Sequence, residues 1–227
     1  MNNSIKFHDI ISKKFSNNYD KKKIFRERYI FLTTKCNDLL KNKPNKNIKI
    51  LDYGCGSGVF SVPLSSYGSV TAIDGSHNMI ELAKSNIKKK NIQNINFRLL
   101  DLDHYTTNKK FELIFCSSVL EYFENFSEHL EKLYSMLADN GTLLLSMPNS
   151  KSFYRVFEKA LFKIVKKPKY YEHVKINKDE NYYKKVFRKE HYTITEVNYF
   201  SVNLKLLNYL PVSLKFKCNM ILFVLTK

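Results

Sequence analysis

The segment that most constrains this chain is residues 48–58, which read IKILDYGCGSG. The apolar run that ends at Asp52 predicts a buried β-strand. The three glycines at alternate positions predict a tight loop, because glycine adopts backbone conformations that let the chain approach a ligand closely. The apolar residues that follow predict a helix, whose first N–H groups have no partner inside the helix. A strand, a glycine loop and a helix in this order indicate an α/β ligand site.

A carboxylate is expected beside this loop. A second apolar strand, residues 69–73, ends at Asp74, which lies 22 residues after Asp52. An acid about 20 residues beyond a glycine loop is placed to accept hydrogen bonds from ribose hydroxyls. The two segments therefore predict a nucleoside site, with turn formation by Asp74 as the alternative.

The order of the acid and the glycines distinguishes between classes of nucleotide-binding loop. A dinucleotide loop reads G-x-G-x-x-G and a phosphate loop ends in G-K-[ST], whereas this loop reads D-x-G-x-G-x-G without a lysine. It resembles motif I of the class I S-adenosylmethionine-dependent methyltransferases. Residues 96–102, 111–122 and 141–149 resemble the third, fourth and fifth strands of that family. The resemblance implies an α/β, Rossmann-like fold: a seven-stranded, mostly parallel sheet with helices on both faces and an antiparallel last strand.

The resemblance also implies S-adenosylmethionine as the cofactor. Asp52 is expected near its ammonium group, Met79 against the adenine, Asp101 at the adenine amine and Ser117 at the amino-acid end. Arg28 could make a charge-assisted contact with its carboxylate. The residues expected at the cofactor are Tyr19, Arg28, Asp52, Gly54, Gly56, Asp74, Gly75, Met79, Asp101, Leu102 and Ser117. The alternatives are turn formation or helix capping for Asp74 and Asp101, core packing for Met79 and a solvated helix face for Tyr19 and Arg28.

Residues 117–122 resemble the corresponding loop of the ubiquinone-biosynthesis O-methyltransferase group. That group has the pattern E-x-x-E-H, which can bind a metal, whereas this chain has Ser118, Glu121 and Tyr122 at the same positions. Because only one of the three ligand-forming residues is retained, no metal is expected at this loop. The missing histidine also removes the most obvious general base. The candidate catalytic residues are Glu121, Tyr122 and His191, with His173 as a further alternative.

The chain is expected to be a single domain of four parts. These are an N-terminal helical cap (1–45), the cofactor-binding core (46–149), an insertion that covers the acceptor (150–190) and the last two strands (191–227). Helices are expected near 57–67, 77–90 and 125–138, with residues 139–141 closing the last of them. Strands are expected at 192–197 and 216–225. Residues 152–167 are amphipathic, and their apolar side is expected to pack over the acceptor site.

The formal net charge of +17 has two interpretations. It could attract nucleic acid or an anionic membrane, but the excess is nearly all lysine, with five arginines, which favours genome composition over a nucleic-acid footprint. Four scattered cysteines and a polar N-terminus indicate the cytoplasm.

The expected function is transfer of a methyl group from S-adenosylmethionine to a small-molecule acceptor, on oxygen by preference. A nucleic-acid methyltransferase is not favoured, because no proline follows strand four at residues 116–119. A cofactor-binding module without catalysis also stays open. A peripheral membrane contact through residues 155–169 is a further expectation, since that segment has a basic face.

Overall fold

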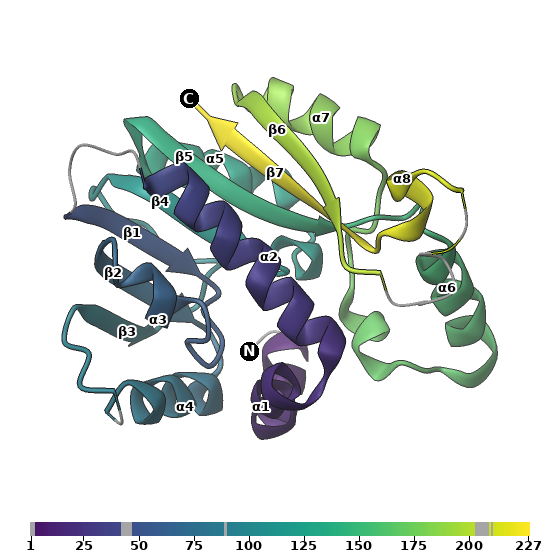
Figure 1. Ribbon diagram of the computed structural model, residues 1–227, viewed down its shortest axis with the longest axis horizontal. Coiled ribbons are helices and arrows are strands. Elements are labelled where there is room, and N and C mark those ends of the chain that lie inside the picture. Colours follow the sequence, from purple (N-terminus) through teal and green to yellow (C-terminus); the bar gives the residue numbers. More distant parts are fainter. Residues whose placement is uncertain (1–2, 42–46, 89, 203–208, 210) are drawn as a thin grey trace.

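The structure is a computed structural model that describes residues 3–41, 47–88, 90–202, 209 and 211–227. A seven-stranded sheet with the order β3-β2-β1-β4-β5-β7-β6 forms its centre (Figure 1). The strands are β1 (Ile48–Tyr53), β2 (Gly68–Asp74), β3 (Ile95–Leu99), β4 (Phe111–Ser117), β5 (Leu137–Pro148), β6 (Thr193–Phe200) and β7 (Met220–Thr226). Strands β1 to β5 pair in parallel, and β7 runs antiparallel between β5 and β6. The predicted fold is confirmed.

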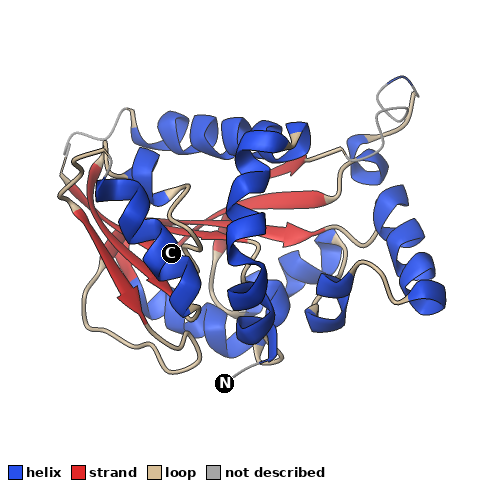
Figure 2. Cartoon of the chain, turned by 90° about the horizontal axis from the view of Figure 1, so that it is seen from below, coloured by secondary structure: helices blue, strands red, loops and turns tan. Residues whose placement is uncertain are grey.

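Helices cover both faces of the sheet, as Figure 2 shows with the strands in red and the helices in blue. Helices α2 (Lys23–Leu40), α3 (Ser61–Leu64) and α4 (His77–Lys88) bury apolar side chains on one face. Helices α5 (Phe126–Met136) and α7 (Glu180–Lys189) bury theirs on the other face. Because strand residues alternate between faces, Ile50 joins the first cluster and Leu51 the second.

Helix α1 (Asn3–Lys21) packs against α4 and α2 at the edge where the parallel strands end (Figure 1). The carboxylate of Asp9 fixes it there, accepting hydrogen bonds from the Ser76 hydroxyl at 2.7 Å and from the Asn78 backbone N–H at 2.8 Å. The predicted N-terminal cap is helical and consists of α1 and α2. Residues 42–46, at the boundary between the predicted cap and the predicted core, lie outside the described residues.

The segment between β5 and β6 contains α6 (Phe153–Val165), the short 3₁₀ helix η2 (Lys169–His173) and α7. Ser152 caps α6, since its hydroxyl accepts a hydrogen bond from the Arg155 N–H at 3.1 Å. Asp179 caps α7 in the same way, through the Tyr182 N–H at 3.0 Å. The predicted amphipathic helix is therefore present.

Three predicted boundaries were wrong. The helix near 57–67 is limited to Ser61–Leu64, because the glycine loop continues in turns up to it. Residues 139–141 do not close a helix: α5 ends at Met136 and β5 begins directly after it. The register between β4 and β5 shifts there, and a Cβ at Gly141 would lie 2.8 Å from the Phe111 carbonyl oxygen, so these residues form a tight irregularity within the strand.

The third error concerns the last strand. Residues 216 and 217 belong to the helical turn α8 (Leu214–Lys217), which the Ser213 side chain caps at the Lys215 N–H. Strand β7 begins only at Met220, opposite Pro148 at the end of β5. The strand that comes last in the sequence thus lies inside the sheet, between β5 and β6.

Candidate functional site

The glycine loop joins the end of β1 to the short helix α3, and all three of its glycines have positive φ, at +75°, +52° and +76°. A Cβ at Gly54 would lie 2.3 Å from Cγ2 of Val119, so the loop packs tightly against the segment after β4. A Cβ at Gly56 would meet nothing closer than the sulfur of Met79, at 3.9 Å. The loop therefore presents open space at Gly56, beside Met79, and none at Gly54.

Asp74 closes the loop from the end of β2. Its two carboxylate oxygens accept hydrogen bonds of 2.8 Å from the backbone N–H groups of Gly56 and Ser76. Burial raises the pKa of this carboxyl, and these backbone donors oppose that shift. A Cβ at Gly75 would lie 2.8 Å from Cδ1 of Ile5, so α1 covers the turn. The structure brings Asp74, Gly75, Gly56 and Met79 together as the sequence predicts.

Asp52 lies beneath the loop and is 2% exposed. The Ser61 hydroxyl donates a hydrogen bond of 2.5 Å to its carboxylate. Burial raises the pKa of Asp52 to about 7, and the Ser61 hydrogen bond opposes this shift. A cationic ligand group close to Asp52 would favour the ionised carboxylate.

Asp101 and Leu102 follow β3, next to the Asp74 turn, where the Leu100 N–H donates to the Asp74 carbonyl at 3.0 Å. Asp101 is exposed and accepts a hydrogen bond from the Asp103 N–H at 3.1 Å, as a turn-forming acid does. Leu102 is buried, and its carbonyl accepts a hydrogen bond from the Tyr53 hydroxyl at 3.0 Å. Both residues lie beside the predicted ribose position, and Asp101 also makes the turn named as its alternative.

Arg28 reaches from α2 to the end of β4. Its Nη2 donates to the hydroxyls of Ser117 at 2.9 Å and Ser118 at 2.5 Å. Its buried Nε has no hydrogen-bond partner among the described residues. Tyr19 packs edge-on against Phe60, with ring centroids 5.8 Å apart. The solvated-face alternative therefore does not hold for Arg28, because its guanidinium contacts Ser117 and Ser118. Its contact with the cofactor stays a prediction.

Glu121 lies in the 3₁₀ helix η1 (Leu120–Tyr122) after β4 and is 4% exposed. Its Oε2 has no hydrogen-bond partner in the described part of the chain. Burial raises its pKa to about 7, although the nearby charges of Arg155 and Arg28 favour the carboxylate. The Glu121 carbonyl accepts hydrogen bonds from the N–H groups of Lys175 at 2.8 Å and Ile176 at 3.0 Å, so the β5–β6 segment folds over this loop.

Of the three catalytic candidates, His191 lies far from the other two, so its prediction as a site residue was wrong. It is exposed and precedes Thr193, which pairs with Thr226 at the edge of the sheet where the parallel strands begin. Strands β1, β2 and β4 end at the opposite edge. Strand β6 runs in the same direction as these strands, so a residue that precedes β6 lies at the edge where they begin. His191 therefore cannot act with Glu121 and Tyr122, which follow the end of β4.

Sequence reasoning missed His8. Its Nδ1 hydrogen-bonds to the Ser4 carbonyl at 2.7 Å, and its ring meets Tyr122 edge-on with centroids 4.8 Å apart. Burial lowers its pKa, while the Asp74 charge opposes that shift. The ring of His173, the further alternative, packs at a tilt of 36° against Phe7, with ring centroids 4.8 Å apart. No motif marks His8, because only the packing of α1 brings it to the site.

A buried ion pair on α6 also escaped the sequence argument. Nη1 of Arg155 lies 2.7 Å from the Glu158 carboxylate and 2.7 Å from the Tyr170 hydroxyl, which donates to the same carboxylate. Glu158 is 2% exposed. The Arg155 Nε is buried without a partner within the described residues. These side chains approach Glu121 from the β5–β6 segment.

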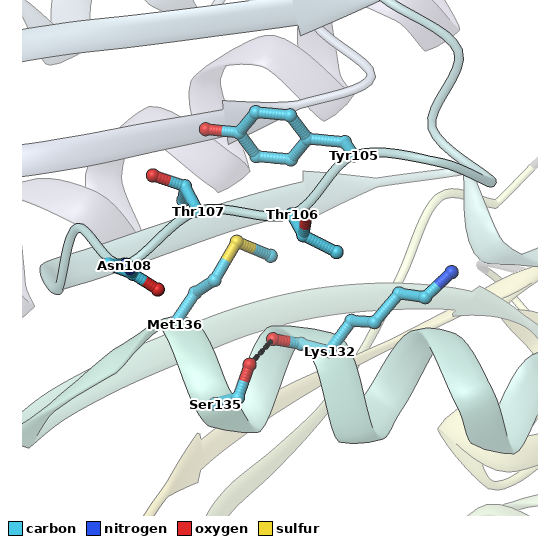
Figure 3. Close-up of a pocket in the computed structure, with 7 residues that line it drawn as sticks. All are labelled: Tyr105, Thr106, Thr107, Asn108, Lys132, Ser135 and Met136. Atoms are coloured by element: carbon cyan, nitrogen blue, oxygen red, sulfur yellow. Dashed lines mark hydrogen bonds between the residues drawn. The ribbon is translucent and has the colours of Figure 1, made fainter.

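A pocket of about 370 Å³ lies elsewhere, between the loop after β3 and α5 (Figure 3). Residues from the two elements line it: Tyr105, Thr106, Thr107, Asn108, Lys132, Ser135 and Met136. None of these was predicted as a site residue, and we assign it no role. Across the described ranges, no three His, Cys, Asp or Glu side chains gather as a metal site would require.

Comparison with known proteins settles the family. The methyltransferase domain model matches residues 44–192, which include the glycine loop, the Asp74 turn and Glu121. The chain belongs to the methyltransferase domain family. This family is the class I S-adenosylmethionine-dependent methyltransferase family, and the fold and glycine loop of this chain agree with it.

Two curated relatives and one solved structure illustrate the likeness. Ubiquinone biosynthesis O-methyltransferase of Pelagibacter ubique (strain HTCC1062) is 33% identical over 109 residues, 48% of this chain and 45% of that protein. Malonyl-[acyl-carrier protein] O-methyltransferase 2 of Ilyobacter polytropus is 30% identical over 112 residues, 48% of this chain and 42% of that protein. The matches thus span about half the length of these relatives.

The structure of magnesium protoporphyrin IX methyltransferase from Synechocystis, with bound S-adenosylhomocysteine, superposes with a TM-score of 0.70 at 20% identity. The match covers 92% of this chain and 88% of that one. At this identity it shows a shared fold.

The residues present fit S-adenosylmethionine, the cofactor of this family. The open space at Gly56 beside the buried Met79 gives room for a ligand. Asp74 keeps acceptor capacity, since a carboxylate offers about four lone-pair directions and two backbone donors use part of them. The unpartnered Nε of Arg28 lies near Ser117 and suits a carboxylate.

Among the residues that the structure describes, no helix is both long and apolar enough to cross a membrane.

Proposed function

We propose that this chain transfers a methyl group from S-adenosylmethionine to an oxygen atom of a small-molecule acceptor. The observation that carries the proposal is Glu121: a buried carboxyl with an unpartnered oxygen, in the loop after β4 that follows Ser117. The two curated relatives are named as O-methyltransferases, which supports oxygen as the acceptor atom.

The cofactor would be held by the residues around the glycine loop. Asp74 would accept hydrogen bonds from the ribose, Asp52 would lie near the ammonium group and Arg28 near the carboxylate. When bound, S-adenosylmethionine supplies a methyl group on a sulfonium centre, which leaves as a neutral thioether. The protein has mainly to position the acceptor and exclude water.

Glu121 would take the proton of the acceptor hydroxyl. With a pKa raised to about 7 by burial, its carboxylate is a stronger base than an ordinary glutamate and is still ionised in a useful fraction near neutral pH. Its free Oε2 is the accepting atom in this proposal. Tyr122, which packs against His8, would form part of the same wall.

The acceptor would be covered from two sides, by residues 1–45 and by 150–190. Four contacts support this division. The N–H groups of Lys175 and Ile176 bind the Glu121 carbonyl. The Tyr183 hydroxyl donates to the Pro148 carbonyl at 3.0 Å, at the end of β5. The ring of His173 from η2 packs against Phe7 of α1, so the two covers meet.

The proposal extends to the compartment, which we expect to be the cytoplasm. All four cysteines are free and buried, which fits a reducing environment. The sequence also predicts a peripheral membrane contact through residues 155–169, and this is part of the proposal.

The test is a transfer assay with methyl-labelled S-adenosylmethionine and fractionated metabolite extracts, beside structured RNA as a competing acceptor. We expect label in a small molecule, as an ether or an ester. Glu121→Gln should retain S-adenosylhomocysteine binding and lose transfer. Label in RNA alone would overturn the proposed acceptor class, and cofactor binding without transfer to any fraction would favour a non-catalytic module.

A further inference from the structure

Helix α6 is oriented opposite to what its sequence pattern predicts. Its apolar stripe was expected to pack over the acceptor site, but Val156, Phe157 and Ile164 are 58%, 59% and 80% exposed. The charged residues Arg155 and Glu158 face the protein instead and form a buried ion pair. The prediction was wrong because this ion pair, with the Tyr170 hydroxyl, fixes which side of the helix is turned inward.

The exposed apolar side chains form one continuous surface. Positions 153, 156, 157, 160 and 164 recur at helical spacing and therefore lie along one side of α6. Phe153 stacks on Phe216 of α8, with ring centroids 5.9 Å apart. Leu214 on the same helical turn is 57% exposed. We call this surface, formed by Phe153, Val156, Phe157, Ile164, Val165, Leu214 and Phe216, the α6–α8 face.

Lysines lie beside this face. Between residues 150 and 170 the chain has six lysines and one acid, and that acid is the buried Glu158. The lysines at 159, 163, 166, 167 and 169 are all exposed. Lys215 and Lys217 lie on α8, and residues 203–227 contain no acid at all. An apolar stripe beside lysines suits the interface of an anionic lipid bilayer, where side chains enter the acyl boundary and cations meet the headgroups.

Position and charge both favour a bilayer over a second copy of the chain. Figure 1 shows α6 at the outer end of the molecule, beyond the sheet, where a flat surface can reach it. Two copies facing each other through this surface would bring lysines against lysines, and like charges at an interface oppose association.

We propose that the α6–α8 face docks the protein on anionic membranes, with the apolar stripe in the interface and the surrounding lysines on the headgroups. The lipids are anionic, and the docking surface includes α8 in addition to α6. It rests on the proposed membrane contact but not on the methyl-transfer chemistry, so the two can fail separately.

The test is co-sedimentation of the full chain with vesicles of phosphatidylcholine alone and of phosphatidylcholine with 30% phosphatidylglycerol. We expect binding to the anionic vesicles that is at least tenfold tighter and that weakens as salt rises. Lys159→Glu/Lys163→Glu and the uncharged Phe157→Ser/Ile164→Ser should each lower that binding at least tenfold.

The matched control is Lys185→Glu/Lys189→Glu, which makes the same change in net charge on exposed lysines of α7. The affinity of this control for the anionic vesicles should stay within about threefold of that of the parent chain, because only the general effect of net charge is lost. S-adenosylhomocysteine binding, measured on each variant, reports an intact fold. Equal losses in the α6 and α7 pairs would overturn the proposal, as would no preference for anionic vesicles. A concentration-dependent dimer that the Phe157→Ser/Ile164→Ser variant loses would identify a second copy as the occupant instead.

Discussion

The carboxylate of Asp74 accepts a 2.8 Å hydrogen bond from the backbone N–H of Gly56, so the last residue of β2 closes on the middle of the glycine loop. This contact joins the two sequence features from which the site was first inferred. It also fixes the direction in which Asp74 presents its remaining lone pairs, because a second backbone donor, Ser76, binds the other oxygen. The parallel pairing of β1 with β2 produces this arrangement.

Asp74→Ala should weaken S-adenosylhomocysteine binding by about 1.5–3 kcal/mol, the usual loss when hydrogen bonds to a charged group disappear. Calorimetry measures the affinity directly. Asp74→Asn retains one carbonyl oxygen and should lose less. Because Asp74 also supports the loop, thermal unfolding of both variants must accompany the titration. Unchanged affinity in a folded Asp74→Ala variant would remove this residue from the cofactor site.

Gly54→Ala and Gly56→Ala should separate loop stability from ligand binding. At Gly54 the new methyl group meets Val119 at 2.3 Å and the backbone has φ of +75°, so we expect a loss of about 2–4 kcal/mol in unfolding free energy. At Gly56 only backbone strain applies, about 1–2 kcal/mol, but the methyl group enters the open space. Denaturant unfolding and ligand titration should therefore rank the two variants in opposite orders.

A matched test of the Gly54 contact is the pair Gly54→Ala/Val119→Ala. Truncating Val119 removes the overlap but leaves the strained φ, so part of the stability lost in Gly54→Ala should return. No recovery in the double variant would show that strain alone accounts for the loss.

Binding of S-adenosylhomocysteine should weaken as pH falls below 7. Burial raises the pKa of Asp52 to about 7, so below that pH its carboxyl is protonated in the free protein. An ammonium group nearby favours the ionised form, and binding must then remove the proton. The affinity should fall by up to about tenfold per pH unit between pH 7 and 5.5. Titrations in Asp52→Asn should give a weaker and flatter profile, while a flat profile in the parent chain would contradict the placement of Asp52.

Turnover should rise with pH through about 7 and then level off, because the ionised Glu121 is the proposed base. Glu121→Gln should lower kcat by about 10²- to 10⁴-fold and leave cofactor affinity unchanged. The profile is measured with the acceptor identified by the labelling assay. Activity that falls as pH rises through 7 would mean that the protonated carboxyl is the working form.

Exhaustive chelation should leave turnover unchanged. Ser118 and Tyr122 occupy two positions at which the related loop has metal-binding residues, and neither is a typical ligand of a divalent ion. Turnover is compared before and after chelator treatment. A large loss that magnesium or zinc specifically restores would contradict this prediction.

The sequence by itself determined the fold class and the cofactor side of the site. The alternation of apolar strands and helices fixes a parallel sheet. The acid–glycine spacing then places Asp52, Gly56 and Asp74 at one edge, because these residues are close in the chain and their strands are neighbours. Met79 follows within one turn of α4. Such local relationships need no knowledge of distant packing.

Only the tertiary structure decided which residues lie on the proposed acceptor side. His8 and Glu121 come from elements more than 100 residues apart, and no spacing rule connects them. His191 failed as a candidate because the edge of the sheet on which it lies depends on the direction of β6. The orientation of α6 depends on one buried ion pair, Arg155–Glu158, whose desolvated charges require each other. An amphipathic pattern gives the two sides of a helix, but only the surrounding contacts determine which side faces the protein.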